Sequence, residues 1–354
     1  MVYGALRIPS CGVSIHFNQK LRQRKMHDRS NTDDRLLSTI TWQATLAIAL
    51  LAALSLSLVG LSCSIEVSAD TLVLMSCYAF CAIYFSFVRP NPKIARGLIC
   101  FGQLVVVILM GVMLSYAAST VPLPYRDADL HAMDQWLGFD RAGYLAVVKK
   151  HEGLRNALSL AYNSMMSQNI LVLAAAILTR RLDRLQFYII AFAVAVTATA
   201  AIACFIPAAN AIIYVDRVAT ELSTLPDGGH SYFPVLEGLR NGTLRVIDFR
   251  SVEGLISFPS FHTANAILFA WALWPIRILR FVLVPLNLLL IAGTPLCGAH
   301  YGVDVIGGAA VAYGAIAATT WLVRARGPSS ALVQAIPSPI DGKPWLRPIW
   351  FSPD

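Results

Sequence analysis

The stretch GLICFGQLVVVILMGVMLSYAAS, residues 97–119, contains no charged residue and decides the class of fold. A helix that crosses the hydrocarbon core of a bilayer needs about 20 mostly apolar residues. This run is long enough, and Lys93 and Arg96 precede it directly. It therefore predicts a transmembrane helix that begins at a basic membrane face.

Seven further apolar runs of similar length lie on either side of this stretch. They cover residues 38–61, 69–88, 157–178, 186–206, 259–276, 279–297 and 303–323. The whole sequence is 56% hydrophobic and only 14% charged, whereas a soluble domain has about 25% charged residues. We therefore predict an all-α fold, a polytopic transmembrane helical bundle of about eight spans.

The orientation of these spans follows from their loops. Most of the 28 Lys and Arg residues lie in the two ends of the chain and in short loops on one side. The positive-inside rule makes that side cytoplasmic, with both termini, and turns residues 120–156 and 207–258 into two extracytoplasmic caps. We expect a multi-pass protein of the plasma or inner membrane. Because the basic residues form no single patch, we expect no nucleic acid partner.

Two histidines and an aspartate stand at the extracytoplasmic ends of the last three predicted spans. His262 lies in FPSFHT, residues 258–263, and His300 lies in GAHYGVD, residues 298–304. One helix leads away from this face and one returns between them, so both imidazoles lie on the same face. Asp304 follows His300 by four residues, which is one helical turn if the last span begins there. Ionisable residues at such positions indicate function.

These residue types suit phosphoryl transfer. A neutral imidazole is a nucleophile near pH 7 once a carboxylate fixes its tautomer, and a second, protonated imidazole can supply the leaving-group proton. Pro259 and Ser260 at a helix start leave backbone N–H groups and a hydroxyl for an anion. Ser260 equally fits the role of a helix N-cap.

The two motifs resemble the signatures of a known enzyme family. PSFH, residues 259–262, and GAHYGVD, residues 298–304, are similar to the P-S-x-H and G-x-H-x-x-x-D motifs of the type 2 phosphatidic acid phosphatase superfamily. The residues in and around the two motifs are most similar to those of the branch of inositol phosphorylceramide synthases and sphingomyelin synthases. The resemblance implies a lipid phosphatase or phosphotransferase without cofactor or metal. It implies His300 as nucleophile, His262 as general acid and Asp304 as the residue that orients His300, through a phosphohistidine.

The resemblance covers about residues 120–324 and sets the expected organisation. We predict a cytoplasmic tail over residues 1–37, three N-terminal transmembrane helices over 38–119, and a catalytic membrane domain over 120–324. A second cytoplasmic tail covers 325–354. The expected partners are the bilayer and a phospholipid or sphingolipid substrate.

Two phosphate-binding cations of the family are missing from this chain. The family has a K-x6-R-P motif upstream of the first histidine motif, but the only Arg-Pro ahead of that motif here is Arg89-Pro90 on the cytoplasmic side, with Ala82 at the lysine position. The Ser-Arg ahead of the second histidine is Gly293-Thr294. These departures argue against a plain phosphatidic acid phosphatase and favour the branch that transfers headgroup phosphates.

The missing cations are expected from the second cap, which holds Arg240, Arg245 and Arg250. Arg250 is preferred because it lies nearest in sequence to the first motif. The expected phosphate-binding set is therefore Ser260, Arg250 and Gly298.

Other polar groups have simpler explanations. The aspartates of the first cap could suggest a metal site, but solvated loop carboxylates are the preferred interpretation; they are Asp127, Asp129, Asp134 and Asp140. The polar residues of segment 162–169 could line a headgroup pocket, but hydrogen bonding between helices is preferred.

Two alternatives from other classes remain. A transporter would show discontinuous helices in matched halves, which the sequence does not display. A membrane zinc hydrolase would use His262, His300 and Asp304 as ligands, but H-E-x-x-H does not occur. The sequence leaves open the choice between phosphatase and phosphotransferase, the lipid headgroup, the acceptor and the oligomeric state.

Overall fold

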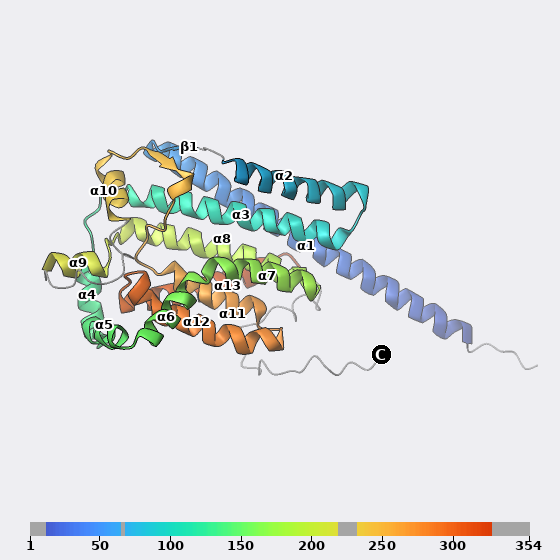
Figure 1. The fold of residues 1–354 in the computed structure, drawn as a ribbon. Coiled ribbons are helices and arrows are strands. Elements are labelled where there is room, and N and C mark those ends of the chain that lie inside the picture. Colours follow the sequence, from blue (N-terminus) through green and yellow to red (C-terminus); the bar gives the residue numbers. More distant parts are fainter. Residues whose placement is uncertain (1–11, 65–67, 219–231, 328–354) are drawn as a thin grey trace, which may run out of the picture.

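A computed structural model describes residues 12–64, 68–218 and 232–327. Helices make up almost all of this part of the chain, so the predicted all-α class is confirmed (Figure 1). The helices are α1 (Gly12–Val59), α2 (Ala69–Ile83), the π-helical turn η1 (Tyr84–Val88), α3 (Pro92–Ser119), α4 (Asp127–Trp136), α5 (Arg141–Lys150), α6 (Glu152–Asn163), α7 (Met165–Leu178), α8 (Leu182–Phe205), α9 (Ala211–Val218), α10 (Phe233–Asn241), the 3-10 turn η2 (Phe249–Ser251), α11 (Phe261–Leu273), α12 (Arg277–Cys297) and α13 (Gly302–Arg324).

Six helices in the described residues are long and apolar enough to cross a membrane, and the pair α6 and α7, bent by 54°, makes a seventh candidate. The one expected span that is not among these seven candidates, 259–276, contains only α11, which has 13 residues. At 1.5 Å per residue α11 is about 20 Å long, shorter than a hydrocarbon core of about 30 Å. Pro275 explains its end, because proline has no backbone N–H to continue the hydrogen bonds of the helix and its ring clashes with the preceding turn.

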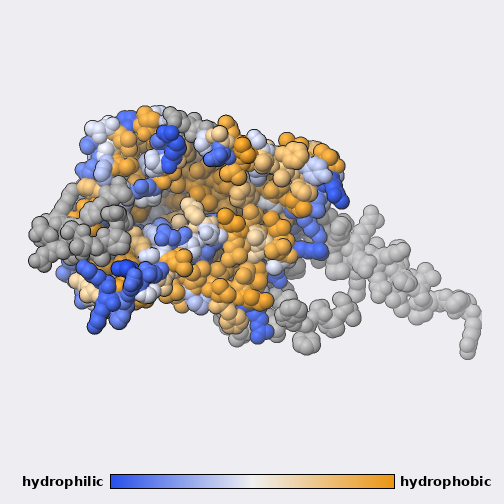
Figure 2. Space-filling view, viewed as in Figure 1, coloured by the Kyte–Doolittle hydropathy of each residue, from blue (hydrophilic) through white to orange (hydrophobic). Residues whose placement is uncertain are grey.

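The bundle is built around α8, which packs against α1, α3, α11 and α13. In the apolar 18-residue stretch of α8, 67% of the residues are buried, whereas none are buried in the corresponding stretch of α2 and η1. Figure 2 shows hydrophobic residues over the flank of the bundle and hydrophilic residues gathered towards its ends. Such an exposed apolar flank is stable in lipid and not in water, so the chain is a multi-pass membrane protein.

Both long loops fold into caps at one end of the bundle (Figure 1). The first cap contains α4 and α5, and the second contains α9, α10 and η2. Two short parallel strands, β1 (Ser62–Ser64) and β2 (Val246–Asp248), connect the end of α1 to the second cap. The starts of α11 and α13 lie at this capped end, which therefore carries the predicted motifs.

The polar stretch before residue 38 is helical from Gly12, where α1 begins, and the part of α1 that is apolar enough to cross a membrane covers Thr32–Val59. At its edge, Arg96 of α3 forms an ion pair with Asp34, with Nη1 and Oδ2 at 2.7 Å. The first 11 residues and residues 328–354, which include most of the expected C-terminal tail, lie outside the described part.

Candidate active site

His300 lies in the short connection between α12 and α13. Ala299 turns the chain there with a left-handed backbone (φ 53°). The Nδ1 atom of His300 is 3.0 Å from Oδ2 of Asp304. An ionised carboxylate only accepts hydrogen bonds, so an ionised Asp304 favours the tautomer of a neutral His300 in which Nδ1 carries the hydrogen and Nε2 keeps a lone pair.

Asp304 occupies the third position of α13 and is fully buried. Besides His300, its Oδ2 atom accepts hydrogen bonds from the backbone N–H of Tyr301 at 3.0 Å and from the hydroxyl of Ser257 at 3.1 Å. An acidic side chain at this position reaches back to the N-cap residue, as in a capping box. The same carboxylate thus starts the helix and fixes the imidazole.

His262 is the second residue of α11 and faces His300, with ring centroids 6.4 Å apart. Tyr162, near the end of α6, stacks on His262 with centroids 4.2 Å apart, and its hydroxyl lies 3.4 Å from Nδ1. The bend between α6 and α7 follows directly after Tyr162. The structure therefore brings together the three residues expected to be catalytic, from three different elements.

Ser260 and Gly298 also lie at this site. Ser260 is the N-cap of α11, where its hydroxyl accepts from the backbone N–H of Thr263 at 3.3 Å. A Cβ atom at Gly298 would lie 3.0 Å from Nε2 of His300 and 2.8 Å from the hydroxyl of Tyr162. Glycine thus leaves open space beside the free nitrogen of His300.

Arg250, the expected cation, is exposed and pairs with Asp248 on its own turn, with Nη2 and Oδ2 at 3.0 Å. Arg240 donates to backbone carbonyls just past α3, and Arg245 donates to a carbonyl at the end of α1. The contacts of these three arginines hold the second cap together and to the bundle. The structure does not bring them to the histidines as the sequence suggested.

A different arginine lies beside His300. Arg141, the first residue of α5, donates from Nη1 to the backbone carbonyl of His300 at 2.7 Å. It is only 9% exposed, and its Nη2 atom is buried without a hydrogen-bond partner among the described residues. Burial lowers the pKa of this guanidinium, and nearby Tyr301 and Asp134 oppose that shift. No sequence signal marked Arg141, because it is one basic residue in a mixed loop.

Two aspartates of the first cap are buried, so the expectation that they are solvated is wrong. Asp134 accepts hydrogen bonds at 2.8 Å from the backbone N–H groups of Gly302 and Val303, the first residues of α13. These N–H groups have no partner within the helix. The cap thereby holds the start of the helix that carries Asp304.

Asp127 links three parts of the capped end. It accepts from the hydroxyl of Tyr301 at 2.9 Å and from two backbone N–H groups before α9 at 2.8 and 3.0 Å. Burial raises the pKa of Asp127. Asp129 is exposed as expected, and Asp140 caps α5. No three carboxylate, thiol or imidazole groups of the described residues converge as a metal site.

The polar segment 162–169 mostly joins helices, as preferred from the sequence. Asn169 accepts from Tyr188, which also donates to Asn265, at 2.8 Å in both cases. Gln168 accepts from the amide of Asn287 at 2.9 Å. Tyr162 differs from its neighbours because it contacts His262.

Comparison with known proteins finds one family. A family model described as the PAP2 superfamily matches residues 128–318, more than half of the chain. This range contains both motifs, the buried Asp134 of α4, and Arg141. No curated protein and no solved structure matches the chain.

Proposed function

Since this chain belongs to the PAP2 superfamily of membrane phosphatases and phosphotransferases, we propose that it transfers a lipid phosphoryl group through a phosphohistidine on His300. The observation that carries the proposal is the buried contact between His300 and Asp304, with His262 across from it. This arrangement leaves one imidazole with a fixed tautomer and a free nitrogen. It also leaves a second imidazole within reach of the group that departs.

In the first step, Nε2 of His300 attacks the phosphorus atom and the bond from phosphorus to the leaving oxygen breaks. His262 donates a proton to that oxygen, so the leaving group departs as a neutral alcohol. The positive charge that develops on His300 is balanced by Asp304. Tyr162 holds the ring of His262 by stacking.

In the second step, a hydroxyl attacks the phosphorus atom and the bond from phosphorus to nitrogen breaks. His262, now neutral, takes the proton of the attacking hydroxyl, and His300 returns to its resting form. Water as acceptor makes the enzyme a phosphatase, and an alcohol makes it a phosphotransferase. In the transferase case the headgroup stays attached to the phosphorus throughout.

Arg141 replaces Arg250 as the proposed phosphate cation. It is buried, charged at all relevant pH values, and has one guanidinium nitrogen without a partner in the described residues. A fixed charge in a site of low dielectric stabilises the phosphoryl oxygens more than a mobile surface arginine does. Gly298 gives the phosphoryl group room beside Nε2, and Ser260 and the free N–H groups of α11 lie at the same place.

We propose the phosphotransferase branch, similar to inositol phosphorylceramide and sphingomyelin synthases, over simple hydrolysis. The residues of the two motifs and the absence of two cations that the family carries support the phosphotransferase branch. The burial of His300, at 3% exposed, also supports it, because a site shielded from water favours an alcohol acceptor. The basic loops at the opposite end of the bundle support an extracytoplasmic site.

The test is incubation of the purified protein with phospholipid labelled in its phosphate, with and without ceramide, diacylglycerol or inositol. We expect a new labelled lipid only with the acceptor, and an acid-labile label on the protein that His300→Ala removes. His131→Ala is the matched control, because His131 is a half-buried histidine of the first cap that contacts Gln135 and Tyr214 and has no part in the proposed reaction. Release of free phosphate or of a phosphorylated headgroup, with no new labelled lipid, supports hydrolysis instead. A label that persists on His300→Ala contradicts the proposed nucleophile.

A further inference from the structure

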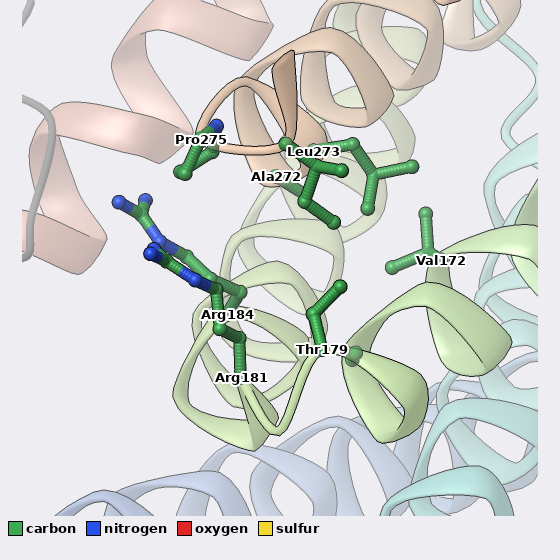
Figure 3. A pocket seen from close by; sticks show the side chains of 9 residues that line it. Val172, Thr179, Arg181, Arg184, Ala272, Leu273 and Pro275 are labelled. Carbon is green, nitrogen blue, oxygen red and sulfur yellow. The ribbon is translucent and has the colours of Figure 1, made fainter. Parts of the chain in front are cut away.

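A second group of buried arginine atoms lies at the end of the bundle opposite the histidines. The turn between α7 and α8 packs there against the end of α11. A shallow hollow, too narrow in this conformation to admit a water molecule, lies between them (Figure 3). Thr179, Arg181, Arg184 and Pro275 contribute to its walls. The reaction proposed above uses none of these residues.

Arg184 is buried, and its neighbour in sequence, Asp183, acts on it as an opposite charge without forming an ion pair in the described residues. Arg184 is 7% exposed, and its Nε and Nη1 atoms are buried without a hydrogen-bond partner among the described residues. No ion pair in that part of the chain includes Arg181 or Arg184. Figure 3 shows their guanidinium groups side by side, both directed towards Pro275. Two like charges in a half-buried place are costly unless an anion joins them.

Two of the surrounding helices favour a positive charge here, whereas α8 begins here and its N-terminal end disfavours one. α7 and α11 both end at this hollow, and the C-terminal end of a helix attracts cations. That attraction explains why arginines are tolerated at this position. It does not give the buried N–H groups of Arg184 an acceptor, so an acceptor from outside the chain fits best.

We propose that this hollow binds one phosphate group, held by Arg184 and Arg181. Arginine forks match the paired oxygens of a phosphate. The hollow is too narrow for a whole headgroup, so the phosphate sits at its mouth. Leu178 and Ile278 beside it are 80% and 78% exposed, and in a membrane such side chains face acyl chains. The ligand chemistry is therefore that of an anionic phospholipid phosphate, which free phosphate shares.

This site lies on the opposite membrane face from the proposed reaction. α11 runs from the catalytic end, where it begins at Phe261, to the hollow, where it ends at Leu273. The proposal therefore stands or falls independently of the phosphohistidine mechanism. The positive-inside rule puts the hollow in the cytoplasmic leaflet.

The experiment counts bound phosphatidylglycerol by native mass spectrometry on the purified full chain in neutral detergent, with phosphatidylcholine as the uncharged comparison. Arg184→Gln and Arg181→Gln remove hollow charges. Arg180→Gln is the matched control, because Arg180 lies in the same turn but is exposed and outside the hollow. A thermal unfolding measurement shows that each variant is folded, whether or not the proposed reaction takes place. If Arg184→Gln does not fold, the less buried Arg181 carries the test.

We expect about a tenfold or greater loss of affinity for one phosphatidylglycerol in both hollow variants, the worth of charge-assisted hydrogen bonds, and less than about a twofold loss in Arg180→Gln. Displacement of the lipid by millimolar inorganic phosphate means that the site accepts the free ion too. Resistance to displacement means that it requires the lipid; both results support phosphate recognition. Equal losses in all three variants, or no preference over phosphatidylcholine, would overturn the proposal.

Discussion

Replacing Asp304 by Asn tests the proposed chemistry with the least change in shape. Oδ2 of Asp304 accepts three hydrogen bonds, from His300, Tyr301 and Ser257. The backbone N–H of Tyr301 cannot rotate away, so the amide oxygen of Asn must take that place. The amide nitrogen then points where Oδ1 of Asp304 lies, and Oδ1 has no partner among the described residues. We therefore expect the fold to survive while the negative charge is lost.

The size of the effect follows from that charge. An adjacent carboxylate is worth about 1.4–4 kcal/mol to a positively charged imidazole, which is about 10- to 10³-fold in rate if it is fully expressed in the transition state. If the amide flips and reverses the tautomer of His300, the loss reaches about 10⁴-fold. We expect kcat to fall by about 10²- to 10⁴-fold, within the limits that these two effects set.

The assay is single-turnover formation of the labelled phospho-enzyme, beside a thermal unfolding measurement. Ser257→Ala removes only one neutral bond and should cost about tenfold or less. Asp129→Asn changes an exposed aspartate of α4 and should leave the rate unchanged. If Asp304→Asn keeps more than a tenth of the wild-type rate, Asp304 does not orient or balance His300.

Three further predictions concern roles, pH and orientation. His300→Ala should abolish turnover, whereas His262→Ala should lose about 10²–10⁴-fold and still form phospho-enzyme from a substrate with a good leaving group; rapid-quench labelling checks both. The pH–rate profile should be a bell whose two limbs belong to the histidine pair together and to neither residue alone; a loss on the acid side only, with activity that chelators remove and zinc restores, would indicate metal ligands instead. A single cysteine near His131 should react with an impermeant thiol reagent in intact cells and one near Arg184 should not, and the reverse labelling would place the site on the cytoplasmic face.

Much of the fold could be predicted because lipid imposes a simple rule on composition. Every apolar run expected to span contains a helix, and the two motifs fall at helix starts on one end of the bundle. The contact between His300 and Asp304 could also be predicted, since it depends on a spacing of four residues. Properties that depend on local sequence and hydropathy could therefore be predicted.

The remaining features depend on tertiary packing. Hydropathy continues through Ser164, so it could not reveal the bend that places Tyr162 on His262. The choice of Arg250 rested on distance along the chain, but Arg141 reaches His300 across 159 residues of sequence. Asp134 was interpreted as a solvated carboxylate because its partners are backbone N–H groups. Such partners leave no pattern of side chains in the sequence.

No residue of α2 is buried. This exposure affects how the protein fits into membranes of different thickness. With η1, α2 forms a 20-residue span of about 30 Å, close to the thickness of a hydrocarbon core. Among the helices, it rests mainly on α3, through contacts such as the hydroxyl of Tyr78 with the carbonyl of Leu98. A span held so loosely can tilt to follow a thinner or thicker bilayer. Adaptation to the host membrane can therefore be confined to one flank, while the helices around α8 keep their positions.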